Sequence, residues 1–174
     1  QSTPWRPVLL AAQRGHHGVL EVLAEHTARG GVTATNWAVW ARDTRETVLH
    51  LVLKKSHKAA LAGLGRDLGE QEARYRKCLD VLLQAGGEVR EQLARVVNKK
   101  DGAEGRKKAE KLNNTALHYA ASLWGQEEVT ALLDLGANIG VRNWRGEIPL
   151  DRILPDTLET FLDRLEGSWH RRRH

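Results

Sequence analysis

Histidine and cysteine are the residues of this chain best suited to bind a metal or to attack a substrate. The sequence holds eight histidines, and two of them, His170 and His174, stand four positions apart, a spacing that places both on one helical face. A zinc site takes three or four ligands, and the arginines between these histidines make a poor scaffold for one. We therefore expect no metal site and no cofactor.

The one cysteine, Cys78, is a candidate reactive thiol. Reactivity requires an exposed thiolate near positive charge, and three basic residues precede Cys78 within four positions. Cys78 is also in phase with Leu79, Leu82 and Leu83, which form one apolar helical face. We predict a buried, unreactive core residue. Because one cysteine cannot form an internal disulfide, a cytosolic setting is the default.

Catalytic motifs are absent from the sequence. It contains no Gly-rich phosphate loop, no nucleophile elbow and no His-Glu-x-x-His pattern. Acidic pairs such as Glu127-Glu128 are adjacent, and adjacent residues do not share a helical face. We therefore do not expect an enzyme.

Composition limits the class of protein further. The chain has 174 residues, of which 41% are hydrophobic and 28% charged, as in globular proteins, and no apolar run reaches the roughly 18 residues of a membrane span. The net charge is +5, but Arg171, Arg172 and Arg173 supply three of these charges, so the body is only mildly basic. With no Met and no signal peptide after Gln1, we expect an internal fragment of a longer protein.

One phrase recurs along the chain. It is clearest at 115–121, Thr-Ala-Leu-His-Tyr-Ala-Ala, and again at 47–53, with degenerate copies at 6–12 and 148–154. The step from Thr115 to Ile148 is 33 residues, which is the ankyrin period. The residue types suit a short, tightly packed helix, because Thr caps its start, Pro fits its first turn and paired alanines let a neighbouring helix approach.

Each copy is followed by a second apolar series with helical spacing, at 19–23, 78–83, 129–135 and 158–165. Gly15 and Gly125 are placed to end the first helix of a unit in the left-handed conformation, and Gly86 and Gly136 the second. Residues 136–146 then form an extended turn. Because such a unit cannot bury its own apolar face, we predict an all-α solenoid of stacked helix-turn-helix units with long insertions.

The segment from Thr115 to Gly146 resembles an ankyrin repeat, and the other copies resemble weaker versions of it. This resemblance implies that His50 and His118 are structural residues that hydrogen-bond neighbouring turns, and that His16-His17 belongs to the turn between two helices. The residues that match the repeat phrase are Thr47, Leu49, His50, Thr115, Leu117, His118, Ala120, Ala121, Gly125, Gly136, Pro149 and Leu150.

A narrower resemblance involves four segments, 4–12, 46–53, 113–121 and 153–163. Together they are similar to the cytoplasmic ankyrin region of invertebrate transient receptor potential channels of the ankyrin class, the painless and pyrexia group. The resemblance implies the N-terminal arm of a cation channel at the plasma membrane, acting in gating, assembly or partner binding beside neighbouring subunits. The alternative is a soluble cytoplasmic adapter that binds proteins. A third interpretation is a nucleic-acid-binding protein that uses the basic insertion and tail.

The phrase divides the chain into six parts: a degenerate repeat at 1–32, a repeat at 33–87 with an insertion at 54–71, a degenerate helix and charged linker at 88–112, a well-formed repeat at 113–146, a partial closing repeat at 147–166 and a tail at 167–174. The step from Thr47 to Thr115 is 68 residues, about two periods, so we expect one degenerate unit between them. The helix predicted at 88–97 would be its remainder.

Basic and aromatic residues are the candidate contacts with partners. Lys99-Lys100 and the basic run 106–108 suit an anionic lipid, a phosphate or an acidic protein patch, although the interleaved acids Asp101, Glu104 and Glu110 dilute the positive charge and favour a solvated loop. Trp37, Trp40, Trp144 and Arg145 are candidate protein contacts, and packing between repeats is the alternative for the tryptophans. Stacking on nucleic acid would need basic residues between the rings, which the stretch from Trp37 to Trp40 lacks.

Overall fold

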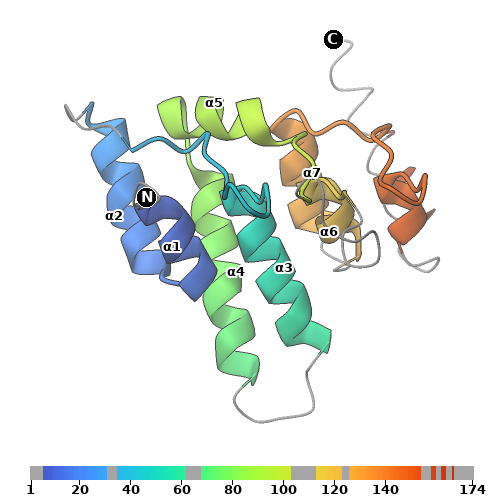
Figure 1. Ribbon diagram of the computed structural model, residues 1–174, viewed down its shortest axis with the longest axis horizontal. Coiled ribbons are helices and arrows are strands. Elements are labelled where there is room, and N and C mark those ends of the chain that lie inside the picture. The colour runs from blue at the N-terminus through green and yellow to red at the C-terminus, as the bar shows by residue number, and fades with distance from the viewer. Residues whose placement is uncertain are drawn as a thin grey trace.

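The computed structural model describes residues 6–30, 35–61, 68–102, 113–122, 126–153, 158–159, 162–163 and 166. In these residues the secondary structure is helical, apart from one isolated bridge between Trp40 and Thr47. The helices are α1 (Pro7–Arg14), α2 (His17–Ala28), α3 (Val48–Leu61), α4 (Leu68–Gln84), α5 (Gly87–Val96), α6 (Ala116–Ser122), α7 (Gln126–Asp134) and a short 3-10 helix, η1 (Pro149–Arg152) (Figure 1). None of the helices in the described ranges is both long and apolar enough to cross a membrane.

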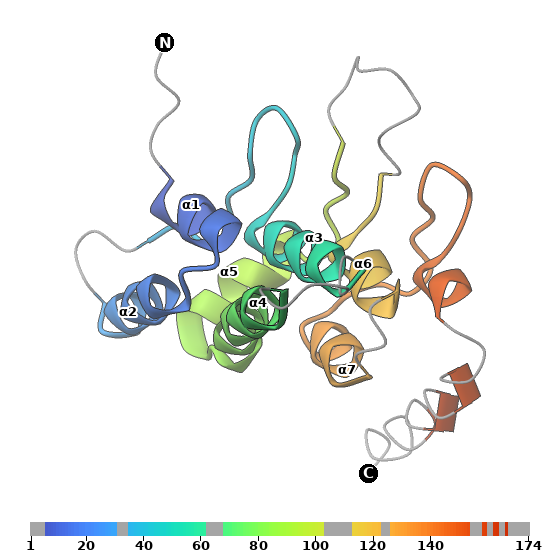
Figure 2. The ribbon, with the colours of Figure 1, turned by 90° about the horizontal axis from the view of Figure 1, so that it is seen from below.

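The helices form two rows. Helices α1, α3, α6 and η1 pack in succession in an inner row, and α2, α4 and α7 form an outer row (Figure 2). Three loops project beyond the inner row, and we call them the fingers: finger one is 35–47, finger two is 98–102 with 113–115, and finger three is 137–148. The predicted all-α stack of helical hairpins is confirmed.

Glycines end two of these helices as predicted. Gly15 follows α1 with φ +71°, and the His16 amide donates to the Ala11 carbonyl at 2.9 Å. A Cβ at Gly15 would meet the Arg74 side chain at 2.9 Å, so glycine also permits the close approach of α4. Gly136 follows α7 with φ +103°. Gly86, in contrast, is extended, and its neighbour Gly87 takes the positive φ of +55° at the start of α5.

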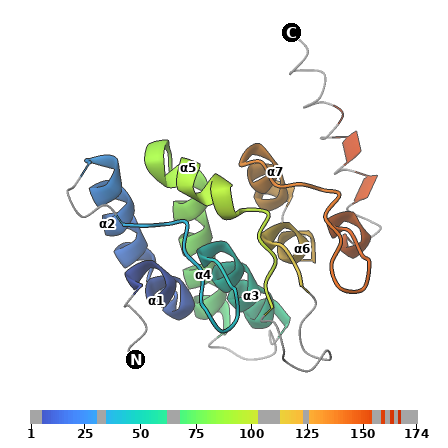
Figure 3. The same cartoon turned by 45° about the horizontal axis from the view of Figure 1, so that its top comes forward.

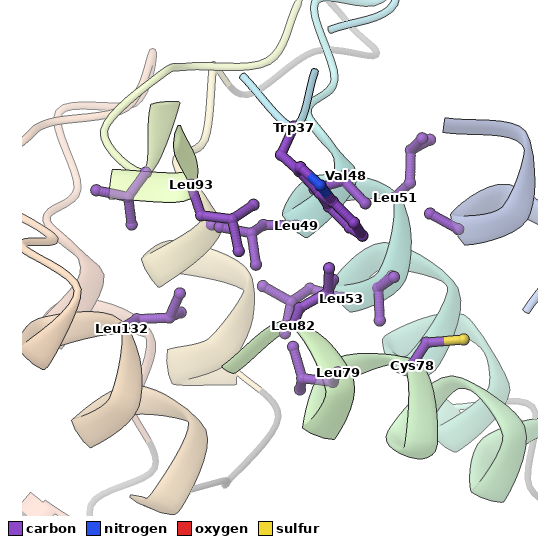
Figure 4. Packing of buried hydrophobic residues seen from close by; sticks show 14 of the residues in the cluster. Trp37, Val48, Leu49, Leu51, Leu53, Cys78, Leu79, Leu82, Leu93 and Leu132 are labelled. Atoms are coloured by element: carbon purple, nitrogen blue, oxygen red, sulfur yellow. The ribbon is translucent and has the colours of Figure 1, made fainter. Parts of the chain in front are cut away.

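The core lies between the two rows and is built from the repeated phrase. Leu49, Leu117, Ala120 and Ala121 are all buried. Side chains from α4 and α5 complete the core, and Figure 4 shows them beside Trp37 and α3. Cys78 is among them and fully buried, so the prediction of a core position is confirmed. Pro149 starts η1 and is buried, and Leu150 packs partly buried against the same core.

One expectation about the middle of the chain is corrected. The described part of the predicted insertion at 54–71 is regular helix, because α3 continues to Leu61 and α4 begins at Leu68. The expected degenerate unit between Thr47 and Thr115 is not formed by the described residues, since α3 packs directly on α6. Longer helices and the additional helix α5 take up part of the extra length.

Helix α5 joins separate repeats instead of forming half of one. It lies between α2 and α7 in Figures 1 and 3. As predicted, its apolar face, which includes Val89 and Leu93, is buried. The Arg90 guanidinium donates to the Asp134 carbonyl at 3.0 Å. The side-chain nitrogen of Asn98, just beyond α5, donates to the Gly136 carbonyl at 3.0 Å. These bonds satisfy carbonyls at the C-terminal end of α7, which have no partners within that helix.

Candidate functional site

The base of finger one is held by a histidine. The Thr47 amide donates to Nδ1 of His50 at 3.3 Å, and Nε2 of His50 lies 2.9 Å from the Asn114 carbonyl in finger two. An amide can only donate and a carbonyl can only accept, so the neutral ring carries its proton on Nε2. His50 therefore hydrogen-bonds the next turn, as the resemblance implied.

The same arrangement recurs one repeat later. The Thr115 amide donates to Nδ1 of His118 at 3.1 Å, and Nε2 of His118 donates to the Glu147 carbonyl in finger three at 3.0 Å. Burial lowers the pKa of both His50 and His118, because it penalises the charged imidazolium. Two neutral histidines thus connect three fingers in series.

A second network, which we call the Asp101 clasp, consists of Glu46, Lys54, Asp101, Asn114 and Tyr119. The Asp101 carboxylate is buried and accepts hydrogen bonds from the Asn114 amide at 2.9 Å and the Tyr119 hydroxyl at 2.6 Å. The Lys54 ammonium lies 3.1 Å from the same carboxylate and 2.6 Å from that of Glu46. The clasp joins finger two to α3, α6 and finger one.

Ionisation in the clasp follows from its geometry. Burial and the adjacent Asp101 carboxylate raise the pKa of Tyr119 to about 12, so its hydroxyl remains a donor at neutral pH. Burial opposes the charged form of Lys54, but the hydrogen bond to Glu46 and the charge of Asp101 raise its pKa overall. Sequence reasoning treated Asp101 as an acid that merely dilutes a basic segment. Its partner Lys54 is 47 positions away, a separation that no local pattern reveals.

Finger three depends on another residue that sequence reasoning missed. The Asn143 side-chain oxygen accepts from the amides of Arg145 at 2.9 Å and Glu147 at 3.0 Å. Its side-chain nitrogen donates to the Asn114 side chain at 3.0 Å. The available signal was the known tendency of Asn to bond a backbone amide two residues on. Asn143 therefore fixes the shape of finger three and ties it to finger two.

The candidate contact tryptophans differ in environment. Trp37 is fully buried, its indole nitrogen donates to the Thr27 hydroxyl at 3.1 Å, and its amide donates to the Gln92 side chain at 2.6 Å. Of the two expectations for Trp37, packing inside the stack is confirmed and contact with a partner is wrong, because α2 and α5 satisfy both polar groups of a ring that fills the core. Trp40, three residues later, is 38% exposed.

The exposed aromatic residues lie in separate fingers. The Lys99 ammonium lies 3.4 Å from the centroid of the Trp40 ring, a cation–π contact between fingers one and two. Trp144 is 59% exposed beside the exposed Arg145 in finger three. Both therefore remain candidate contact residues.

A cleft of about 630 Å³ lies between α1 and finger one. Its apolar lining consists of Leu9, Leu10, Trp40, Ala41 and Leu51, and its polar lining of Arg6, Gln13, Arg42, Asp43, Thr44 and Glu46. Arg6 donates to the Trp40 carbonyl and so links the two walls. A concave site that combines apolar side chains with polar groups able to orient a ligand is typical of binding pockets.

Charge is distributed unequally in the described parts of the fingers. Glu46 and Asp101 are held by Lys54, and Glu147 accepts a hydrogen bond from Asn143. Asp43 is the one acidic residue of these finger segments that is exposed, whereas four basic residues are exposed: Arg42, Lys100, Arg142 and Arg145. We call Trp40, Arg42, Lys100, Arg142, Trp144 and Arg145 the finger face. Its exposed charge is mainly positive.

Other candidate sites offer less chemistry. Burial raises the pKa of the Cys78 thiol to about 11, so the thiol is protonated at neutral pH. Within the described ranges, no group of three or more His, Cys, Asp or Glu residues is arranged to hold a metal. Gly125, the basic run 106–108, and the pair His170 and His174 lie outside the described residues.

Comparison with known proteins identifies part of the stack. Residues 112–144 match the ankyrin repeat family model. A chain from the crystal structure of the yeast ribosomal protein Rps3 in complex with its chaperone Yar1 is similar to 88% of this chain and 85% of its own length, with 20% identity and a TM-score of 0.49. None of the curated proteins matches this chain. The family match and the stacked helical hairpins together define an all-α, ankyrin-like fold.

Proposed function

We propose that this chain is a non-catalytic scaffold that binds other proteins through its finger face and the adjoining cleft. The observation that carries the proposal is the combination of a cleft with aliphatic lining and exposed Trp and Arg side chains on fingers one and three. Trp and Arg dominate the binding energy of many protein interfaces, because both offer large contact areas. Repeat stacks generally bind partners on such continuous surfaces.

Rigid fingers support this role. The Gly102 amide donates to the Thr44 carbonyl at 2.8 Å and joins fingers one and two, while Asn143 joins fingers two and three. A surface that is already ordered loses less conformational entropy when a partner binds. The two buried histidines and the Asp101 clasp therefore serve binding indirectly, by holding the fingers in place.

The test is quantitative capture of partners by purified wild-type and variant protein. Trp40→Ala and Trp144→Ala should remove partners that the wild type retains, while leaving the thermal midpoint near its original value. The matched control is Val22→Ser, which changes a side chain of α2 that is 65% exposed and lies outside the finger face. Equal retention by the finger variants and the control would overturn the proposal.

A more specific proposal is that the chain is the cytoplasmic arm of a transient receptor potential channel. Its support is the resemblance of the four segments 4–12, 46–53, 113–121 and 153–163 alone. It predicts location at the plasma membrane, whereas the adapter predicts the cytoplasm. Flanking coding sequence tests the difference, because a channel requires six apolar spans soon after the last repeat. A stop codon shortly after His174 would exclude the channel and leave the protein-binding proposal intact.

A further inference from the structure

We infer that the cleft between α1 and finger one receives a bulky apolar side chain from an acidic segment of a partner protein. The inference rests on the proposed function and names the chemistry of the partner. It combines two independent features, the apolar floor of the cleft and the excess of exposed positive charge on the fingers beside it.

The cleft is suited to an apolar anchor. Leu9, Leu10, Leu51 and Ala41 supply aliphatic lining, and the volume of about 630 Å³ is ample for one large side chain. Leu10 and Ala41 are partly exposed, so an incoming side chain would remove apolar surface from water. Such burial is the usual source of affinity at the centre of an interface.

The charges beside the cleft favour acidic neighbours of that anchor. Arg42 lines the cleft and is exposed, and Lys100 is exposed in finger two. Glu46 also lines the cleft, but its carboxylate is 2.6 Å from the Lys54 ammonium and is therefore already compensated. Asp43 is the remaining acid in the lining. Arg42 in the lining and Lys100 on the neighbouring finger two therefore leave an excess of exposed positive charge that favours a carboxylate-rich segment.

The same contacts argue against nucleic acid as the occupant. Single-stranded nucleic acid binds through bases stacked on free aromatic faces. The Lys99 ammonium, 3.4 Å from the ring centroid, covers one face of Trp40, and the rest of the described apolar lining is aliphatic.

Selection from a random displayed-peptide library against the whole chain tests this inference. Enriched peptides should carry a large apolar residue flanked by Asp or Glu. Leu10→Ser and Arg42→Glu should each raise the Kd of a selected peptide about tenfold, and replacing its apolar residue by Ser should do the same. Affinity should fall as salt is raised, because the flanking charges are exposed.

Matched controls lie outside the cleft. Val22→Ser repeats the loss of an exposed apolar side chain, and Arg95→Glu repeats a charge reversal at an exposed residue of α5. Both should leave the Kd unchanged. Far-UV circular dichroism and the thermal midpoint establish that each variant is folded.

The inference would be overturned if the selection gave no enrichment, or gave peptides without an acidic or apolar bias. It would also be overturned if both cleft variants bound a selected peptide as the wild type does. Tighter binding of oligo(dT) or of phosphatidylserine vesicles than of any peptide would overturn it as well. Peptides whose binding depends on Trp144 and Arg145 but not on the cleft would refute the inference alone. Loss of finger dependence for every protein partner would refute the proposed function as well.

Discussion

The repeat that contains His50 and the repeat that contains His118 share a local motif in different surroundings. In both, a Thr amide donates to Nδ1 of a His three residues later, and the His bonds a carbonyl in the next finger. The acceptor for His50 is Asn114, whose own amide is held by the Asp101 clasp. The acceptor for His118 is Glu147, in a part-buried position before the four-residue helix η1. The phrase sets the local bonds, and the neighbours determine how much each bond stabilises the fold.

The largest effect should come from placing a charge at the equivalent apolar position of each repeat. Leu49 and Leu117 are both buried, and an aspartate at either position would be a buried charge without a partner. We expect Leu49→Asp and Leu117→Asp each to cost about 3–5 kcal/mol of unfolding free energy. Leu49→Asp should cost more, because α3 packs between the helices α1 and α6, whereas on its far side α6 packs against the four-residue η1 among the described residues.

Urea denaturation followed by far-UV circular dichroism measures these costs. Leu162→Asp is the matched control, since Leu162 is 44% exposed and should tolerate the charge. If the two core variants unfolded at the same urea concentration as the control, the assignment of the repeat phrase to the core would be wrong.

Removing either histidine should have the next largest effect on the unfolding free energy, and the loss should differ between the two repeats. His50→Ala leaves the Thr47 amide unpaired in a buried site and removes one of the two donors to the Asn114 carbonyl, which keeps the Asp101 amide, so we expect a loss of about 3 kcal/mol at most. His118→Ala should cost about 1 kcal/mol less, because water can reach the part-buried bond to Glu147. The exposed His16→Ala is the control. Equal costs for His50→Ala and His118→Ala would mean that burial of the acceptor does not distinguish the repeats.

The same two histidines should make the unfolding free energy depend on pH. Burial lowers the folded-state pKa of His50 and His118, so below pH 6.5 the unfolded chain binds protons that the folded chain does not. The stability from neutral burial is complete above pH 6.5 and declines as pH falls toward the folded-state pKa values. Each histidine contributes a loss of up to about 1.4 kcal/mol per pH unit.

Thermal melts of wild type and His50→Ala between pH 7.5 and 5.5 isolate this contribution. The variant should lose less stability over that interval than the wild type does. Parallel curves for the two proteins would show that His50 is not buried as the neutral form.

The helices of the repeats could be predicted from the sequence, whereas the Asp101 clasp and the cleft could not, and the reason is physical. The phrase and its glycines act over a few residues, so they predicted the helices, the left-handed Gly15 and the buried Cys78. The Asp101 clasp depends on partners in other repeats and has no local signature. Trp37 and Trp40 have the same residue type and nearly the same position, yet only the packing of α2 and α5 over Trp37 buries it. The candidate cleft likewise combines α1 with a finger about 30 residues away in sequence, and only the stacked structure brings its walls together.

The smallest effect should come from the loss of one hydrogen bond in the Asp101 clasp. Tyr119→Phe removes one 2.6 Å hydrogen bond while Asp101 keeps Lys54 and the Asn114 amide, so we expect a loss of about 1 kcal/mol. Tyr75→Phe, which removes an exposed hydroxyl bond to Gln13, should cost less.

A double-mutant cycle then measures whether the clasp supports the histidine bond. Because Asp101 holds the backbone of Asn114 from both its amide and its carbonyl side, Tyr119→Phe should reduce the cost of His50→Ala by about 0.5–1 kcal/mol. The cost of His118→Ala should change less, since Glu147 is outside the clasp. Equal coupling to both histidines would indicate that Tyr119 acts through the general packing of α6, whereas coupling to His50 alone would establish the clasp as the cause of the difference between the repeats.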